Sequence, residues 1–146
     1  MTREEVTAAK ALAAAPSWHW AEGMLVCSDD VPDALGTRRC TVLDVNGVAV
    51  ACLGVSSGGA PLLHWPARSS RCYPNIADDA TIGVLLARLM DRHPDSALWV
   101  SPKSGGWCWR RAGGNAITPP DQQSYSLGLV VARGLAHDWG LNANVK

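Results

Sequence analysis

The sequence contains no phenylalanine, no excess charge of either sign and no long apolar run. Thirteen basic and thirteen acidic side chains give a formal net charge of zero. Non-specific binding to nucleic acid depends on clustered Lys and Arg that neutralise phosphates, so this balance makes DNA a poor partner. No apolar stretch approaches the roughly 18 residues of a membrane-spanning segment. We therefore expect a chain that binds neither DNA nor a membrane.

Targeting and metal-binding signals are also missing. Residues Met1 to Glu5 lead into an Ala-rich segment that resembles neither a signal peptide nor a transit peptide. The five cysteines, at positions 27, 40, 52, 72 and 108, are odd in number and form no C-x-x-C pair. Such cysteines are typical of small buried side chains in a reducing compartment. The closest approach to a zinc ligand pair is Cys72 with His64, across an eight-residue gap, so we expect no metal, no cofactor and a cytoplasmic location.

What the chain does contain indicates one globular domain. Of its 146 residues, 47% are apolar and only 18% charged, a composition that excludes a disordered chain. We predict a single domain over residues 1–146, with 141–146 as a frayed tail. Ten Arg and seven Trp stand out. Both residue types are enriched at recognition surfaces, although a GC-rich genome and Trp in place of Phe in the core are the simpler explanation.

Periodicity and turn signals divide the chain into helices and hairpins. Asn46-Gly47 is the dipeptide preferred in a type I′ turn, and Ile82, Leu85, Leu86, Leu89 and Met90 follow helical spacing. The predicted elements are a helix from the Thr2 capping box to Ala15, a strand over Met24–Cys27, a hairpin of Arg39–Val45 and Val48–Leu53, a strand over Pro61–Trp65 near a sheet edge, a helix from Asp78 or Asp79 to His93, a hairpin of Ala97–Ser101 and Trp107–Arg110, and a helix from near Pro120 to Trp139 closed by Gly140.

This order of elements predicts the fold class. Hairpins require antiparallel pairing, and the apolar face of an antiparallel sheet needs helices to cover it. We predict an α+β fold in which an antiparallel sheet of about five to six strands has helices packed on one side.

No catalytic constellation is evident. Gly54-Val55-Ser56-Ser57-Gly58 matches the G-x-S-x-G nucleophile elbow, but an apolar segment follows where that motif requires a helix. The four His are dispersed, and the paired aspartates are explained by turns and helix caps. We therefore assign no catalytic residue and do not expect an enzyme.

The segment from His64 to Asn75 is the strongest candidate for ligand binding. It holds two arginines, two aromatic residues, an asparagine and two serines, and it precedes a helix N-terminus, where free amides attract anions. Arg92 stands on one polar side of the following helix, one turn from Arg88. A nucleotide held by stacking and bidentate contacts is one interpretation, and a plain surface loop is the other.

Two stretches resemble small phage and prophage proteins. They are Trp18-His19-Trp20 with Gly23-Met24, and the segment that runs from Pro74-Asn75 through Asp78, Ala80-Thr81 and Gly83 to Leu85-Leu86. The resemblance covers about the last two-thirds of the chain. Among phage proteins of this size and layout, the chain looks most like the Thoeris anti-defence sponges, which bind cyclic ADP-ribose-type immune signals in an oligomer without cleaving them. That likeness implies that Trp65 stacks on a base, Asn75 contacts base or ribose, and four arginines clamp phosphate: Arg39, Arg68, Arg71 and Arg92.

Two functions are thus expected from the sequence. The first is a phage-encoded counter-defence protein, in the cytoplasm of the infected bacterial host, that sequesters a cyclic nucleotide-type signal as a homo-oligomer. The alternative is a protein-interaction module that inhibits a host defence enzyme by direct contact, anchored by the Trp-rich hairpin from Trp99 to Trp109.

Overall fold

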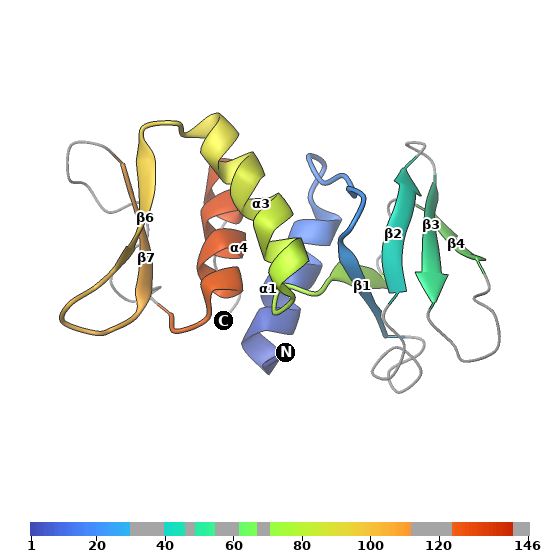
Figure 1. Cartoon of the computed structure of the whole chain (residues 1–146), viewed down its shortest axis with the longest axis horizontal. Coiled ribbons are helices and arrows are strands. Elements are labelled where there is room, and N and C mark those ends of the chain that lie inside the picture. Colours follow the sequence, from blue (N-terminus) through green and yellow to red (C-terminus); the bar gives the residue numbers. More distant parts are fainter. Residues whose placement is uncertain (30–39, 46–48, 55–61, 67–70, 112–123, 142–146) are drawn as a thin grey trace.

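The computed structural model describes residues 1–29, 40–45, 49–54, 62–66, 71–111 and 124–141. In these ranges the chain forms three helices and seven strands (Figure 1). The helices are α1 (Arg3–Ala14), α3 (Asp79–Arg92) and α4 (Leu127–Asp138). The strands are β1 (Leu25–Ser28), β2 (Cys40–Val45), β3 (Ala49–Gly54), β4 (Leu62–Pro66), β5 (Cys72–Pro74), β6 (Ser96–Val100) and β7 (Trp107–Arg111).

The strands form two sheets rather than one. Five strands pair antiparallel in the order β4-β3-β2-β1-β5, and β6 pairs only with β7 in a second, two-stranded sheet. The helices lie between the two sheets (Figure 1). The α+β class is therefore confirmed, but the single sheet with helices on one side needs correction. The β6–β7 hairpin does not join the five-stranded sheet because the helices that cover that sheet lie between them.

The core fills the helical layer and its two flanks. Helix α1 contacts β5 and α4, and α4 contacts α3 and β7. The most deeply buried side chains come from the three helices, from β7 and from the turn before α3, and they include Leu12, Ile76, Leu85, Leu89, Trp109 and Leu135. Helix α4 is buried on most of its surface, since Gly128 through Ala132 are all buried in succession. This central position makes α4 the element on which both flanks depend.

The tryptophans near the N-terminus belong to this core. Trp18 meets Trp20 edge to face at 5.3 Å between ring centroids, and Trp139 at 6.4 Å. Arg88 lies over the Trp18 ring at 5.5 Å and donates to the carbonyl of His19 at 2.8 Å. Burial lowers the pKa of Arg88. The Trp18-His19-Trp20 segment is thus packed into the core, and Arg88 of α3 stabilises that packing.

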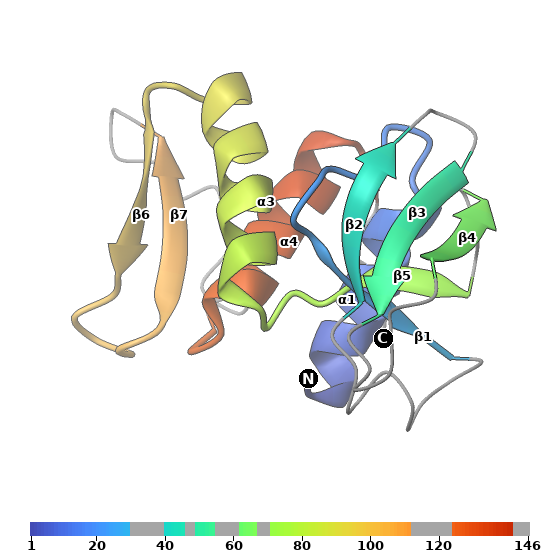
Figure 2. The ribbon, with the colours of Figure 1, turned by 45° about the vertical axis from the view of Figure 1, so that its right-hand side comes forward.

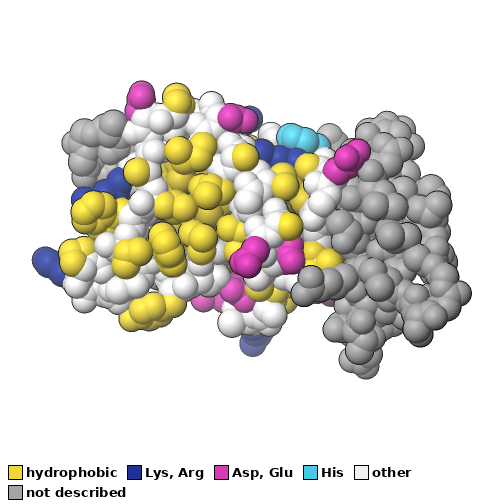
Figure 3. Space-filling view, viewed as in Figure 1, with side chains coloured by type: hydrophobic (Ala, Val, Ile, Leu, Met, Phe, Trp, Pro, Cys, Tyr) yellow, Lys and Arg dark blue, Asp and Glu magenta, His cyan; other side chains and the backbone are white. Residues whose placement is uncertain are grey.

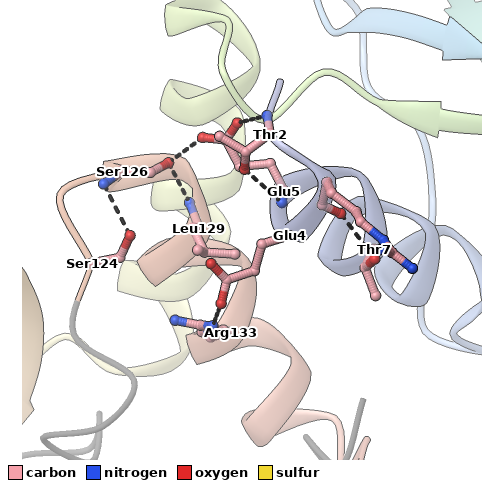
Figure 4. Close-up of polar contacts among 9 residues, drawn as sticks. Thr2, Glu4, Glu5, Thr7, Ser124, Ser126, Leu129 and Arg133 are labelled. Atoms are coloured by element: carbon pink, nitrogen blue, oxygen red, sulfur yellow. Dashed lines mark hydrogen bonds and ion pairs between the residues drawn. The ribbon is translucent and has the colours of Figure 1, made fainter. Parts of the chain in front are cut away.

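Polar contacts tie the N-termini of α1 and α4 together (Figure 4). The predicted capping box is confirmed: Glu5 N donates to Thr2 Oγ1 at 3.2 Å, and Thr2 N donates to Glu5 Oε2 at 2.6 Å. The other carboxylate oxygen of Glu5 accepts from Ser126 Oγ at 2.6 Å. Ser126 is the N-cap of α4 and accepts in turn from Leu129 N. One carboxylate therefore serves two helix ends, and the ion pair between Arg133 and Glu4 reinforces the same junction.

The last helix begins later than predicted and ends as predicted. The predicted start near Pro120 is wrong, because Ser124 forms a bridge with Trp107 and α4 begins at Leu127. The N-cap at Ser126, rather than Pro120, determines where α4 begins. At the other end Gly140 has φ 67°, and Leu141 N donates to Ala136 O at 2.9 Å, the pattern of a Schellman motif. Residues 142–146 of the predicted tail lie outside the described chain.

Strand β5 was not predicted. Residues 72–74 were interpreted as part of a loop, yet they pair with β1 and all three are buried. Cys27 lies opposite Tyr73, and Asn75 N donates to Leu25 O at 2.8 Å. The segment is too short to display an alternating pattern, so pairing with β1 and packing on α1 decide its conformation.

The described helices include none that combines the length and apolar character needed to cross a membrane.

Candidate interaction surface

The β6–β7 hairpin presents two faces of different character. Trp109 lies opposite Leu98 and faces the helical layer, where its side chain is fully buried. The other face alternates with it and carries Trp99 opposite Cys108, and Ala97 opposite Arg110; on this outward face Cys108 is buried, whereas Trp99, Ala97 and Arg110 are exposed. Trp99 retains 46% of its surface in contact with solvent. The hairpin therefore displays one large aromatic side chain on a support whose other face is anchored in the core.

Arg110 holds the indole of Trp99 in place. Its guanidinium carbon lies 5.2 Å from the ring centroid, in cation–π range. The two residues sit on adjacent strands in diagonal positions, since Arg110 pairs with Ala97 and Trp99 with Cys108. Trp and Arg are two of the residue types enriched at the energetic centres of protein interfaces.

A second exposed aromatic residue lies at the turn of the same hairpin. Tyr125 is 81% exposed, yet its hydroxyl donates to the carbonyl of Ser104 at 2.7 Å. The turn itself is closed by bonds from Gly105 N to Ser101 O at 2.7 Å and from Ser101 N to Gly106 O at 2.9 Å. Gly105 adopts φ 68°, which a side chain would disfavour. Tyr125 is thus exposed and already fixed in orientation.

Apolar side chains also gather between β6 and α3, on the side of β6 that faces away from Trp99. Figure 3 shows hydrophobic side chains gathered over β6 and the adjoining helix, with charged groups around them. Val100 is 47% exposed, and Leu86, Met90 and Leu98 are half-buried against the core. Scattered apolar side chains are normal on a protein surface, but a contiguous group rimmed by charge marks a site of association.

The residues predicted to bind a nucleotide are not assembled by the described part of the chain. Trp65 is in β4, the edge strand, opposite Val50. Arg39 and Arg68 lie outside the described residues. Arg71 and Asn75 flank β5, which is the other edge of that sheet, with three strands between β5 and β4 in the hydrogen-bonding order. The structure therefore brings Arg71 and Asn75 to one edge and assigns Trp65 to the opposite one.

The side chain of Asn75 and the start of α3 already have partners. Asn75 Oδ1 accepts from Ala77 N at 3.1 Å, which shapes the turn before the helix. Asp78 caps α3 by accepting from Thr81 N at 3.0 Å and Thr81 Oγ1 at 3.1 Å, while Thr81 Oγ1 accepts from Leu25 N. A carboxylate of the chain itself thus occupies the helix end at which an anionic ligand was expected.

Arg92 is engaged in a cluster between α3 and α4. It donates to Asp138 Oδ2 at 2.5 Å, and His93 Nε2 lies 2.9 Å from Asp138 Oδ1. Burial raises the pKa of the Asp138 carboxyl, but hydrogen bonds and charges from Arg92 and His93 outweigh it and hold that pKa below its ordinary value. His93 and Asp138 are a dyad, but Ser96 Oγ donates to the His93 carbonyl at 2.5 Å and not to its ring. The cluster therefore clamps two helices and presents no nucleophile.

No metal site occurs among residues whose positions are described, since they contain no group of three His, Cys, Asp or Glu able to hold an ion. Comparisons of the chain with protein-family models, with curated proteins and with solved structures gave no match. The exposed surface of the β6–β7 hairpin is therefore the candidate interaction site.

The sequence predicted the hairpin as an interaction element but not all the residues that form its exposed surface. The predicted anchor spanned Trp99 to Trp109, and of its ends only Trp99 is exposed. Arg110 and Tyr125 were not singled out. Strand alternation relates Arg110 to Trp99, so that pair was available from the sequence, whereas the bond of Tyr125 to Ser104 joins residues 21 apart and left no local signal.

Proposed function

We propose that the chain is a protein-interaction module that inhibits a host defence enzyme by direct contact, with the outward face of the β6–β7 hairpin as its docking surface. The observation that carries the proposal is the half-exposed indole of Trp99, which contacts Arg110 and belongs to a hairpin fixed to the core by the buried Trp109. An aromatic side chain fixed before binding loses little conformational entropy when a partner covers it. The resemblance to phage proteins supports a partner from host defence.

The test is site-specific crosslinking in bacterial cells that express the protein. A photoreactive amino acid replaces Ala97, which is exposed beside Trp99 on the outward face. The matched control replaces Ala87, an exposed alanine of α3. We expect one host protein, distinguished by its mass from a crosslinked second copy of the chain, to be captured from position 97 and not from position 87.

The same crosslink must depend on Trp99. We expect the substitution Trp99→Ser to abolish it, and purified protein, but not the Trp99→Ser variant, to inhibit the captured enzyme. Equal crosslinking from positions 97 and 87, or full inhibition by Trp99→Ser, contradicts the proposal.

A second proposal is the sequestration of a cyclic nucleotide-type signal without cleavage, by a homo-oligomer in which Trp65, Arg39, Arg68, Arg71, Asn75 and Arg92 contribute. It is favoured by the position of Arg71, an exposed cationic residue directly before β5 and close in sequence to Asn75. Calorimetry against a panel of cyclic nucleotides tests it, with Arg71→Ala as the variant and Arg3→Ala, an exposed arginine of α1, as its control. Heat that is unchanged in Arg71→Ala, or absent with every nucleotide, contradicts this second proposal.

A further inference from the structure

Strand β6 has one edge that no described strand occupies. In the part of the chain that the structure covers, β6 pairs with β7 alone. In Figure 2, β6 is the outermost labelled element at that end of the molecule. An edge strand exposes unpaired N–H and C=O groups and is usually protected by charge, proline or a bulge. The β6 sequence, Ser-Ala-Leu-Trp-Val, contains none of these protections.

The hydrogen-bonding pattern identifies which groups point outward. Trp107 N donates to Ser124 O at 2.7 Å, and Ser124 N donates to Trp107 O at 3.4 Å. Trp107 therefore turns its backbone groups away from β6, and its partner Val100 must turn its own away from β7. By the alternation of an antiparallel ladder, Leu98 and Ser96 do the same, whereas Trp99 and Ala97 face β7.

We infer that this edge pairs with the same edge of a second copy of the chain, antiparallel about a two-fold axis at Leu98. Leu98 then bonds the second copy's Leu98 through two N–H···O=C bonds. Val100 N donates to the second copy's Ser96 O, and the symmetry repeats that bond. Ser96 N takes no part because it donates to His93 O at 3.0 Å in its own chain. Four backbone bonds thus join β6 to β6 in one continuous four-stranded sheet.

The side chains of β6 are self-complementary in this register. On the outward face, Trp99 lies beside the second copy's Ala97, so each large ring is next to a small side chain. The strand carries no charged residue, so the two-fold axis brings no like charges together. Trp99, at 46% exposure, gains an apolar contact on pairing, whereas Val100 lies beside the second copy's Ser96. A closed two-fold contact uses the same patch twice, and this strand fits itself.

The second copy also completes the proposed docking surface. Because Ala97 pairs with Arg110 across each hairpin, Trp99 of one chain would lie between its own Arg110 and, beyond the second copy's Ala97, the second copy's Arg110. The inference concerns assembly and does not rest on the proposed function. It predicts a docking surface with two indoles flanked by guanidinium groups, which suits an acidic and symmetric partner surface.

Amide hydrogen exchange tests the pairing without any substitution. The amides of Ala97 and Trp99 bond β7 within one chain and are protected at every protein concentration, so they serve as internal controls. The amides of Leu98 and Val100 have no partner among the described residues of their own chain, so we expect their exchange to slow by about tenfold or more as the concentration rises through the dissociation constant. Rapid exchange of Leu98 and Val100 at all concentrations, or protection that does not depend on concentration, overturns the inference.

A matched pair of substitutions at Val100 gives a second test. Val100→Pro removes the outward N–H, and Val100→Ala keeps it while shortening the side chain to a similar extent. Sedimentation velocity should show wild type and Val100→Ala as dimers. The loss of two bonds should raise the dissociation constant of Val100→Pro about 30-fold, at about 1 kcal/mol for each bond. A monomeric wild type, or equal dissociation constants for the Pro and Ala variants, contradicts the pairing; loss of the crosslink from position 97 with the dimer intact contradicts only the proposed function.

Discussion

Trp99 and Trp109 belong to one hairpin but lie on its opposite faces. Trp109 is fully buried against the helical layer, and Trp99 is nearly half exposed. The two residues differ neither in type nor in secondary structure, and only the face of the strand separates them. The comparison shows that the inward face supplies stability, and this leaves the outward face free to carry an aromatic side chain for another purpose.

Charged groups follow the same division. In the helical layer, Glu5 accepts from Ser126, and Asp138 is bonded to both Arg92 and His93. These charges have hydrogen-bonding partners that satisfy them within the fold. Arg110, in contrast, lies over an aromatic ring, an arrangement that leaves its N–H groups able to donate further. The charged groups of the helical layer thus stabilise the fold, whereas the guanidinium of Arg110 on the hairpin can donate to a partner.

The largest expected effect comes from truncating the two tryptophans. Trp109→Ala leaves a large void beneath β7, so we expect the free energy of unfolding to fall by about 3–5 kcal/mol. Trp99→Ala removes an exposed ring and one cation–π contact, so we expect a loss below about 1 kcal/mol. Denaturant unfolding of both variants measures the difference. Similar losses for the two variants would remove the distinction between the faces.

Two glycines extend the same test to the helices. A Cβ on Gly128 would stand 1.7 Å from the carbonyl oxygen of Ile76, a backbone atom that cannot move aside. Gly128→Ala should therefore cost about 3 kcal/mol or more. Gly83, on the exposed side of α3, has no atom within 4 Å of that position, so Gly83→Ala should stabilise the protein by about 0.5–1 kcal/mol. Thermal unfolding distinguishes these opposite signs, and a stable Gly128→Ala variant would contradict the close contact of α4 with Ile76.

The junction carboxylate of Glu5 should make stability depend on pH. The hydrogen bond from Ser126 is the main reason why the pKa of Glu5 lies below its ordinary value of 4.5, with the Thr2 contacts adding to it against the opposing effect of burial. The stabilisation is therefore complete above pH about 4.5 and is lost as the pH falls through the lower, folded-state pKa. Glu5→Gln should cost about 1–3 kcal/mol at pH 7 and flatten the acid limb of the stability curve.

The matched control for this prediction is Glu4→Gln. Glu4 belongs to the same helical turn and pairs with Arg133, but its side chain is largely exposed, so the effect on the acid limb should be small. Asp138, whose pKa is also lowered, accounts for the slope that remains in Glu5→Gln. An acid limb of equal slope in wild type and Glu5→Gln would contradict the role of Glu5 at the junction.

Local chemistry predicted most of the elements. The Thr2 capping box, the helical spacing after Asp78 and the Schellman end at Gly140 each depend on residues within one or two turns, and each is confirmed. Strand β5 depends on a distant partner, β1, and was missed for that reason, whereas α4 begins after a local N-cap, Ser126, that the sequence interpretation passed over in favour of Pro120. The division of the strands into two sheets likewise follows from helix packing, which no local pattern encodes.

The candidate site shows the same limit. The sequence indicated recognition through Trp and Arg, but it could not decide which of them face solvent. Arg92 was predicted to hold phosphate and instead bonds Asp138, which lies 46 residues further along the chain. Trp99 was predicted as part of an anchor and is exposed. Burial and long-range pairing, rather than residue type, determine which candidates remain.

The smallest expected effect is that of Arg110→Ala, which distinguishes a contribution to stability from a contribution to binding. Arg110→Ala should change the free energy of unfolding by no more than about 0.5 kcal/mol, because both members of the pair are exposed. Its effect should appear at Trp99, whose ring loses a cation 5.2 Å from its centroid and becomes more accessible to acrylamide quenching. The quenching difference between wild type and Arg110→Ala must vanish in a Trp99→Ala background, since the chain holds seven tryptophans. Lys103→Ala, which removes the same charge from the turn of this hairpin, should leave quenching unchanged.

Docking of the partner should weaken about 2- to 5-fold in Arg110→Ala, the equivalent of 0.5–1 kcal/mol for one exposed cation–π contact. Unaltered docking and quenching would mean that Trp99 is held by the strand alone and that Arg110 contributes nothing to the outward face.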